Sequence, residues 1–177
     1  MIIGLTGYAQ SGKDTVAAFL VEHYGFTRVA FADKLREFSY EINPIVKPGL
    51  KLQDVVNEMG WEKAKVRIPE VRRILQDVGL SARNMFGTAV WVDQVAKAMP
   101  SGPVVITDVR FLNEAQFIKN AAGEIWRVER PGVLAVNTHI SESQLDGFNF
   151  DKTINNDGDL KDLFSEVAEA IMVHNDR

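Results

Sequence analysis

Nine consecutive residues near the start of the chain have the types and spacing of a phosphate-binding loop. Residues 7–15 read GYAQSGKDT, which contains the G-x-x-x-x-G-K core of a P-loop. Glycines let the backbone curl so that several N–H groups point at phosphate oxygens, and the helix expected from Lys13 onward adds the positive end of its dipole. The Lys13 ammonium can reach the β- and γ-phosphates of a nucleoside triphosphate. The candidate nucleotide-binding residues in this loop are Gly7, Gln10, Ser11, Gly12, Lys13, Asp14 and Thr15.

The residue after the lysine departs from the standard motif. A P-loop has Ser or Thr directly after its lysine, where the hydroxyl binds Mg²⁺, whereas this chain has Asp14 there and Thr15 one position later. Two interpretations of Asp14 stay open: it holds Mg²⁺ through water, or it is only a first-turn carboxylate that suits the helix dipole. Thr15 is expected to contact a phosphate near the start of the helix.

A second apolar run also ends in residues suited to phosphate chemistry. Val104-Val105-Ile106 predicts a buried strand, and Asp108 and Arg110 follow it. Because ligands bind at the carboxyl ends of parallel strands, both side chains are expected beside the phosphate loop. Asp108 would hold Mg²⁺ or a nucleotide hydroxyl, and the forked guanidinium of Arg110 would clamp a phosphate. The candidate metal ligands are therefore Asp14 and Asp108.

The acceptor of the phosphate would be held by a different part of the chain. Pro69 to Gly79 predicts an amphipathic helix that begins at the proline and ends at the glycine. On its polar face Gln76 lies one turn from Arg72 and Arg73, and an arginine for phosphate beside a glutamine for a base edge would suit a nucleoside monophosphate. Further candidates for the acceptor are Lys34, Arg36 and Trp91, the last as a stacking partner for a base.

An arginine also precedes the least regular segment. Arg130 follows a strand expected over 124–128 and leads into residues 131–150, which lack periodicity and are expected to form a lid over the nucleotide. Phosphoryl transfer gains most from positive charge at the γ-phosphate. Arg127 is interpreted as a surface residue, and His139 as a lid or loop residue. The candidate catalytic residues are Lys13, Arg110 and Arg130.

Composition limits the classes of protein. The chain has 177 residues, a net charge of −4 and no cysteine. This size suits one domain with its own core, the negative charge disfavours a nucleic-acid binder, and disulfides and cysteine zinc sites are excluded. No apolar run approaches the roughly 20 residues of a membrane span, and no signal peptide is visible, so a cytoplasmic protein without a membrane partner is expected.

Short β-type runs alternate with helical runs, which predicts an α/β fold with a mainly parallel sheet. The expected strands are Ile2–Thr6, Thr27–Phe31, Val104–Ile106, Glu124–Val128 and Thr153–Ile154. The expected helices are Lys13–His23, Lys34–Ile42, a short one ending near Gly60, Pro69–Gly79, Thr88–Ala98, Asn113–Ala122 and a last one that carries Leu160, Leu163, Val167 and Ile171 on one stripe.

Several short blocks, in order along the chain, resemble the deoxynucleoside monophosphate kinases of bacteriophages. The blocks are SGKDT at 11–15, RRILQDVG at 72–79 followed by Trp91, DVR at 108–110, VERPG at 128–132, THISE at 138–142 and INNDGDL at 154–160. Only the first is specific alone, but the ordered set covers nearly the whole chain.

The resemblance implies a P-loop fold of the nucleoside monophosphate kinase type, with about five parallel strands flanked by helices. It implies transfer from ATP, with Mg²⁺, to a deoxynucleoside monophosphate (dNMP), for the supply of DNA precursors. It would place Asn156 and Asp157 near the adenine of ATP. The residues it assigns to the acceptor are Arg73, Gly79, Trp91, Asp108 and Arg110.

The resemblance also implies one kinase domain over 1–177, with an acceptor-binding insertion at about 34–90 and the lid at about 131–150. The segment between Asn43 and Pro69 is short beside larger family members, so base preference stays open, as does a homodimer. The closest alternative is a kinase of the phosphomevalonate or dephospho-CoA type. A P-loop ATPase is a weaker alternative, because small size and negative charge disfavour it.

Overall fold

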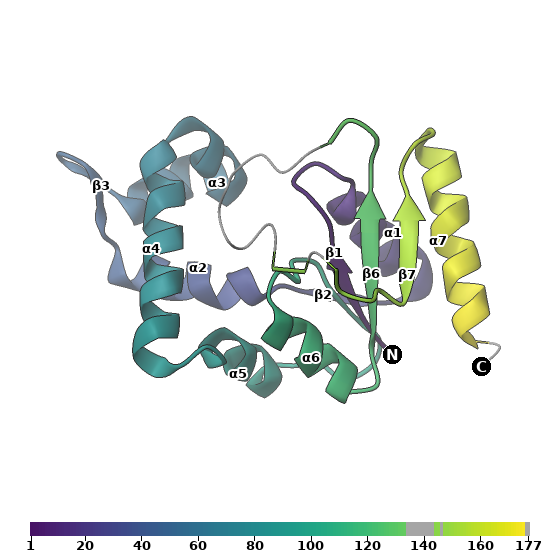
Figure 1. Cartoon of the computed structure of the whole chain (residues 1–177). Coiled ribbons are helices and arrows are strands. Elements are labelled where there is room, and N and C mark those ends of the chain that lie inside the picture. The colour runs from purple at the N-terminus through teal and green to yellow at the C-terminus, as the bar shows by residue number, and fades with distance from the viewer. Residues whose placement is uncertain (134–143, 146, 176–177) are drawn as a thin grey trace. The chain divides into compact units, whose positions relative to one another are not determined.

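The computed structural model describes residues 1–133, 144–145 and 147–175 (Figure 1). The chain divides into two compact units. The first comprises Met1–Ala30 and Ala98–Arg177, and the second comprises Phe31–Lys97. The insertion expected at 34–90 falls within the second unit, and its part in acceptor binding stays a prediction.

A five-stranded parallel sheet forms the first unit, as predicted. Its strands are β1 (Ile2–Thr6), β2 (Thr27–Val29), β5 (Val104–Ile106), β6 (Glu124–Glu129) and β7 (Lys152–Asn155). Their order across the sheet is β2-β5-β1-β6-β7, and every neighbouring pair is parallel. The strand order reverses at β1, which lies between β5 and β6. The carboxyl end of β1 is therefore where a ligand crevice is expected in such a sheet.

Helices cover both faces of this sheet. Helices α1 (Lys13–Tyr24) and α7 (Leu160–Asn175) share one buried apolar cluster with alternate residues of the strands, among them Ile3, Leu5 and Trp126. Helix α6 (Leu112–Asn120) covers the opposite face, since a Cβ on Gly4 would lie 2.6 Å from the side chain of Ile118. Burial on both faces explains why the central strands β1 and β5 are almost continuously apolar.

The second unit is mainly helical. It contains α2 (Phe31–Ile42), a two-stranded antiparallel ribbon of β3 (Ile45–Lys47) and β4 (Leu50–Lys51), α3 (Leu52–Arg67), α4 (Pro69–Phe86) and α5 (Val90–Lys97). Its own apolar cluster joins the ribbon, α3 and α4 through Val46, Leu52, Val55, Ala64, Ile68, Val71 and Ile74.

Two helices were expected to end at glycines, and the structure contradicts one of these ends. Helix α4 continues past Gly79 to Phe86. A Cβ at position 79 would lie 3.2 Å from the side chain of Leu35 on α2, so a larger residue there would crowd the neighbouring helix. The glycine allows two helices to approach and does not end one. The helix expected to end near Gly60 is confirmed, because Gly60 has a non-helical backbone (φ 74°, ψ 161°). A second helical segment follows it within α3, across a kink at this glycine.

Smaller differences lie at other element ends. The expected second strand stops at Val29, and Phe31 already begins α2, so Asp33 lies in the first helical turn. Strand β3 begins two residues after Asn43, where the sequence predicted no strand. Asp159 caps α7, since its Oδ1 accepts the N–H groups of Lys161 and Asp162 at 2.7 and 3.0 Å. Among the described residues, no helix is long and apolar enough to cross a membrane.

Candidate active site

The loop between β1 and α1 has the backbone shape that a phosphate cradle needs. Gly7, Gln10 and Gly12 all have positive φ angles, of 134°, 67° and 107°. Gly12 immediately precedes α1, whose first turn has no side-chain cap. The N–H groups of that turn therefore point out of the helix toward the loop, with the positive end of the helix dipole.

Lys13 closes the loop on itself. Its Nζ donates to the carbonyl oxygens of Gly7 and Tyr8, both at 2.7 Å. Ser11 is 1% exposed, and its Oγ has no hydrogen-bond partner among the described residues. A buried hydroxyl without a partner costs about 1–3 kcal/mol, and a phosphate oxygen in the loop would supply one. The loop, its lysine and this hydroxyl therefore fit the phosphates of a nucleoside triphosphate.

The glycine positions of the loop are sterically fixed. A Cβ on Gly7 would lie 2.3 Å from the carbonyl oxygen of Val128, which belongs to β6. A Cβ on Gly12 would lie 2.5 Å from Nδ2 of Asn156. That Nδ2 donates to the carbonyl oxygen of Ser11 at 2.8 Å, so the turn after β7 is fastened to the phosphate loop. The structure thus places Asn156 against the loop, while Asp157 beside it is exposed.

The turn after β5 also reaches the carboxyl edge of the sheet. The N–H of Val109 donates to the carbonyl oxygen of Leu5 at 3.1 Å, which ties this turn to the end of β1. Asp108 is half-buried and Arg110 is exposed. Asp108 and Arg110 thus follow β5 at the edge where the phosphate loop follows β1, as the sequence predicts; their contacts with a substrate stay predictions.

Glu114 shapes this turn, and the sequence reasoning missed it. It is 4% exposed, and its Oε2 accepts the N–H groups of Arg110 and Phe111 at 2.8 and 3.0 Å. The helix expected over Asn113–Ala122 begins one residue earlier, at Leu112, and Glu114 accepts the N–H groups at its N-terminal end. The signal was available, because a glutamate at the third helical position often accepts such N–H groups.

We expect Glu114→Ala to lower the free energy of unfolding by about 2 kcal/mol, because two hydrogen bonds to a buried carboxylate are lost. Urea unfolding followed by circular dichroism measures this. Gln116→Ala, at an exposed position of the same helix, is the control and should change stability by less than about 0.5 kcal/mol. Equal stabilities of the two variants would contradict the role of Glu114.

Arg127 is not the surface residue that the sequence suggested. Its guanidinium carbon lies 5.6 Å from the ring centre of Tyr8 and 5.2 Å from that of Phe150, and its Nε is 2.7 Å from Oε1 of Glu129. Tyr8 belongs to the phosphate loop, so this cation packs directly against it. Its surroundings are brought together by the fold and are not visible in the local pattern.

Arg130 lies just beyond β6 and is exposed. Most of the expected lid, including His139, lies outside the described residues, which resume at 144–145 and 147–175. The roles of Arg130, His139 and the lid therefore stay predictions.

Apart from Asp108 and Arg110, the expected acceptor residues belong to the second unit, where neighbours hold several of them. Lys34 pairs with Glu37 at 2.6 Å, and Arg36 pairs with Glu62 at 2.9 Å. Trp91 is 8% exposed, packs near Phe38, and donates from Nε1 to the carbonyl oxygen of Gly79 at 3.2 Å. Its indole N–H is thus used within the protein.

Arg73 and Gln76 are exposed on α4. Arg73 donates to Glu70 at 2.8 and 2.5 Å and also to Asp77. These hydrogen bonds raise the pKa of Arg73, the largest contribution coming from Glu70, and the same pair lowers the pKa of Glu70. The arginine stays charged, and its neighbouring carboxylates would have to give way to an acceptor phosphate.

Comparison with known proteins gives the family. A model of the family described as deoxynucleotide monophosphate kinase matches residues 51–167. A protein of Acanthamoeba polyphaga mimivirus, provisionally assigned the same activity, is 28% identical over 97% of this chain and 96% of its own length. The deoxynucleotide monophosphate kinase of Enterobacteria phage T4 is 30% identical over 70% of this chain. That match spans 52% of the T4 protein, about half its length.

A solved structure shares the fold. Dephospho-CoA kinase from Campylobacter jejuni superposes with a TM-score of 0.52 over 97% of this chain and 95% of its own, at 16% identity. At this identity the likeness shows the fold alone and does not extend to the substrate. The family match covers most of the chain and includes the turns after β5, β6 and β7, so the chain belongs to the deoxynucleotide monophosphate kinase family.

Proposed function

We propose that this protein transfers the γ-phosphate of ATP to a deoxynucleoside monophosphate, giving ADP and a deoxynucleoside diphosphate. The observation that carries the donor half is the loop of residues 7–12, with Lys13 inside it and the Ser11 hydroxyl buried without a partner. Family membership supports the acceptor half.

The loop would bind the donor phosphates through its backbone N–H groups, the first turn of α1 and the Ser11 hydroxyl. Lys13 would exchange its bonds to the carbonyl oxygens of Gly7 and Tyr8 for phosphate oxygens. This exchange places its positive charge at the β- and γ-phosphates, where negative charge builds up during transfer. Asn156 would keep the loop in shape through Ser11.

The carboxylates near the loop suit Mg²⁺, which prefers oxygen ligands and is commonly held by one or two carboxylates together with substrate phosphates. Asp14 is exposed in the first turn of α1, and Asp108 is half-buried after β5. Either would hold the ion, directly or through water. Bound Mg²⁺ would neutralise charge on the phosphates and help to orient them.

Arg110 and Arg130 would stabilise the transferring phosphoryl group. Neither needs to form a covalent bond, because such transfer depends on positioning and charge stabilisation. Lys34, Arg36, Arg73, Gln76, Gly79 and Trp91 would bind the acceptor, with the cations directed to its phosphate.

A coupled assay of ADP release tests the proposal. The protein is supplied with Mg-ATP and each dNMP or ribonucleoside monophosphate in turn, beside a reaction without acceptor. We expect ADP release only with particular dNMPs. ADP release that does not depend on an acceptor would indicate an ATPase instead, and silence with every nucleotide would reject a nucleotide acceptor.

A further inference from the structure

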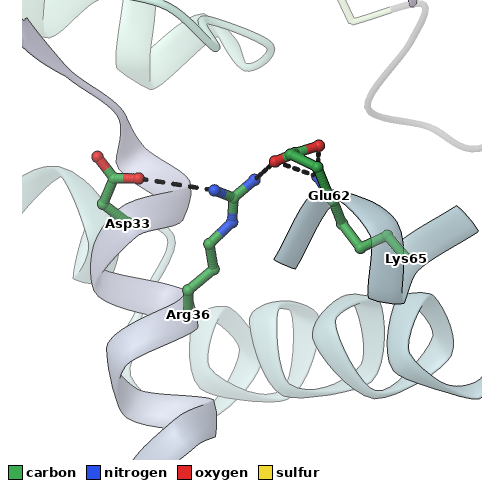
Figure 2. A network of polar contacts seen from close by, with 4 residues as sticks. All are labelled: Asp33, Arg36, Glu62 and Lys65. Atoms are coloured by element: carbon green, nitrogen blue, oxygen red, sulfur yellow. Dashed lines mark hydrogen bonds and ion pairs between the residues drawn. The ribbon is translucent and has the colours of Figure 1, made fainter. Parts of the chain in front are cut away.

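Four charged side chains form a network within the second unit, between α2 and the part of α3 that follows the kink (Figure 2). Arg36 donates from Nη2 to Oε1 of Glu62 at 2.9 Å. Lys65, one turn along α3 from Glu62, donates to the same oxygen at 3.0 Å and lies 2.8 Å from Oε2. Asp33 is more distant, with its Oδ1 4.0 Å from Nη1 of Arg36. One carboxylate therefore binds two cations that come from two helices.

The cations are covered and the carboxylate is not. The side chains of Arg36 and Lys65 are 21% and 23% exposed, whereas that of Glu62 is 75% exposed. Glu62 thus lies on the solvent side of the pair, where rotation of its own side chain is enough to remove it. The cations are held more firmly by their surroundings, so they would stay in place if the carboxylate left.

The electrostatics of the pair favour an anion. Burial raises the pKa of Glu62, but hydrogen bonds and charge from Lys65 and Arg36 outweigh this, so its pKa is lower than usual. A carboxylate brings one negative charge and two oxygens. A phosphomonoester brings about 1.5 to 2 negative charges and three terminal oxygens at neutral pH, which matches two cations better. The arginine fork also suits phosphate geometry.

We propose that Arg36 and Lys65 bind the 5′-phosphate of the acceptor, and that Glu62 occupies this position until the acceptor displaces it. The inference rests on the proposed function, which supplies the phosphomonoester. It adds Lys65 to the acceptor residues expected from sequence. It makes Glu62 a built-in competitor that lowers the apparent affinity for the acceptor, since only the fraction of protein with the pair exposed binds.

Calorimetric titration of the full chain tests the proposed phosphate site. The protein is titrated with each of the four dNMPs and with the matching deoxynucleosides. Glu62→Gln keeps the size of the side chain and removes its charge, so the Kd for a bound dNMP should fall about threefold to tenfold. Lys65→Met should raise it by about tenfold. Neither change should alter the Kd for the deoxynucleoside, which lacks the phosphate. Glu58→Gln, an exposed glutamate earlier on α3, is the control and should leave both constants unchanged.

The direction in which Glu62→Gln changes the Kd for the dNMP shows whether Glu62 competes with the phosphate or only holds Arg36 in place. If Glu62 only holds Arg36 in place, the variant binds the dNMP more weakly, and weaker or unchanged binding overturns the competitor role. An unchanged Kd in Lys65→Met rejects Lys65 as a phosphate ligand. An equal change in deoxynucleoside binding rejects the phosphate as the group recognised.

Failure of the proposed function would look different. In that case the wild type releases no ADP in response to any dNMP in the coupled assay. Parallel titrations of the wild type and Glu62→Gln with inorganic phosphate then test the anion site itself. Tighter binding by the variant supports a phosphate site at Arg36 and Lys65, and equal or weaker binding rejects it.

Discussion

Lys13→Met is expected to lower kcat by about a thousandfold, because it removes the positive charge that, in the proposed mechanism, would lie at the β- and γ-phosphates. Methionine keeps the length of the side chain but cannot donate to phosphate oxygens. It also loses the two 2.7 Å bonds to Gly7 and Tyr8 that close the loop. The coupled assay at saturating ATP and acceptor measures kcat, and circular dichroism verifies the fold.

Lys161→Met is the matched control for this variant. Lys161 is an exposed lysine in the first turn of α7, where its backbone N–H donates to Asp159 and its carbonyl oxygen accepts from Ser165. Its kcat should stay within about twofold of the wild type. Near-normal turnover by Lys13→Met, with ATP still bound, would reject the mechanism proposed for the loop.

Gly7→Ala is expected to destabilise the fold by about 3 kcal/mol and to abolish ATP binding. Gly7 has φ of 134°, where side chains are strongly disfavoured, and its new Cβ would meet the carbonyl oxygen of Val128 at 2.3 Å. That oxygen belongs to a sheet strand and moves only at the expense of the sheet. Backbone strain and overpacking each cost about 1–3 kcal/mol. Thermal unfolding and ATP titration measure the two effects.

Gly102→Ala is the control that separates the cost of a side chain at positive φ from the cost of a steric clash. Gly102 also has a positive φ, of 91°, but nothing lies within 4 Å of a Cβ there. This variant should be destabilised by about 1 kcal/mol and should bind ATP normally. If Gly7→Ala were no less stable than Gly102→Ala, the close packing of the loop on β6 would be disproved.

The donor loop was predictable from sequence because its determinants are local. Seven of its candidate residues lie within nine positions, and each type has a direct chemical reason at that position. The strand order around β1 was less accessible. The sequence predicted about five parallel strands from alternating patterns, and the structure supplies which strands are neighbours.

Features that depend on distant partners were missed. Gly79 was interpreted as a helix end because a glycine is the usual stop signal, whereas its reason is contact with Leu35, 44 positions earlier. Arg127 packs against Tyr8 and Phe150, which lie near opposite ends of the first unit's sequence. Arg36 was a candidate, but its partner Glu62 is 26 positions away. Local patterns carry no information on such pairings.

The position of β1 in the sheet has a consequence for biosynthesis. This strand emerges from the ribosome before any of its partners, yet both its edges pair with strands from the other end of the chain, at Val104–Ile106 and Glu124–Arg127. The phosphate loop that follows it is fastened by Asn156, 145 positions after Ser11. Early translation therefore exposes an apolar strand with unpaired edges, and the phosphate loop gains its hydrogen bond to Asn156 only after β7 has been synthesised. Pairings over such separations also slow folding, so β1 is expected to gain its sheet partners only after most of the chain has been synthesised.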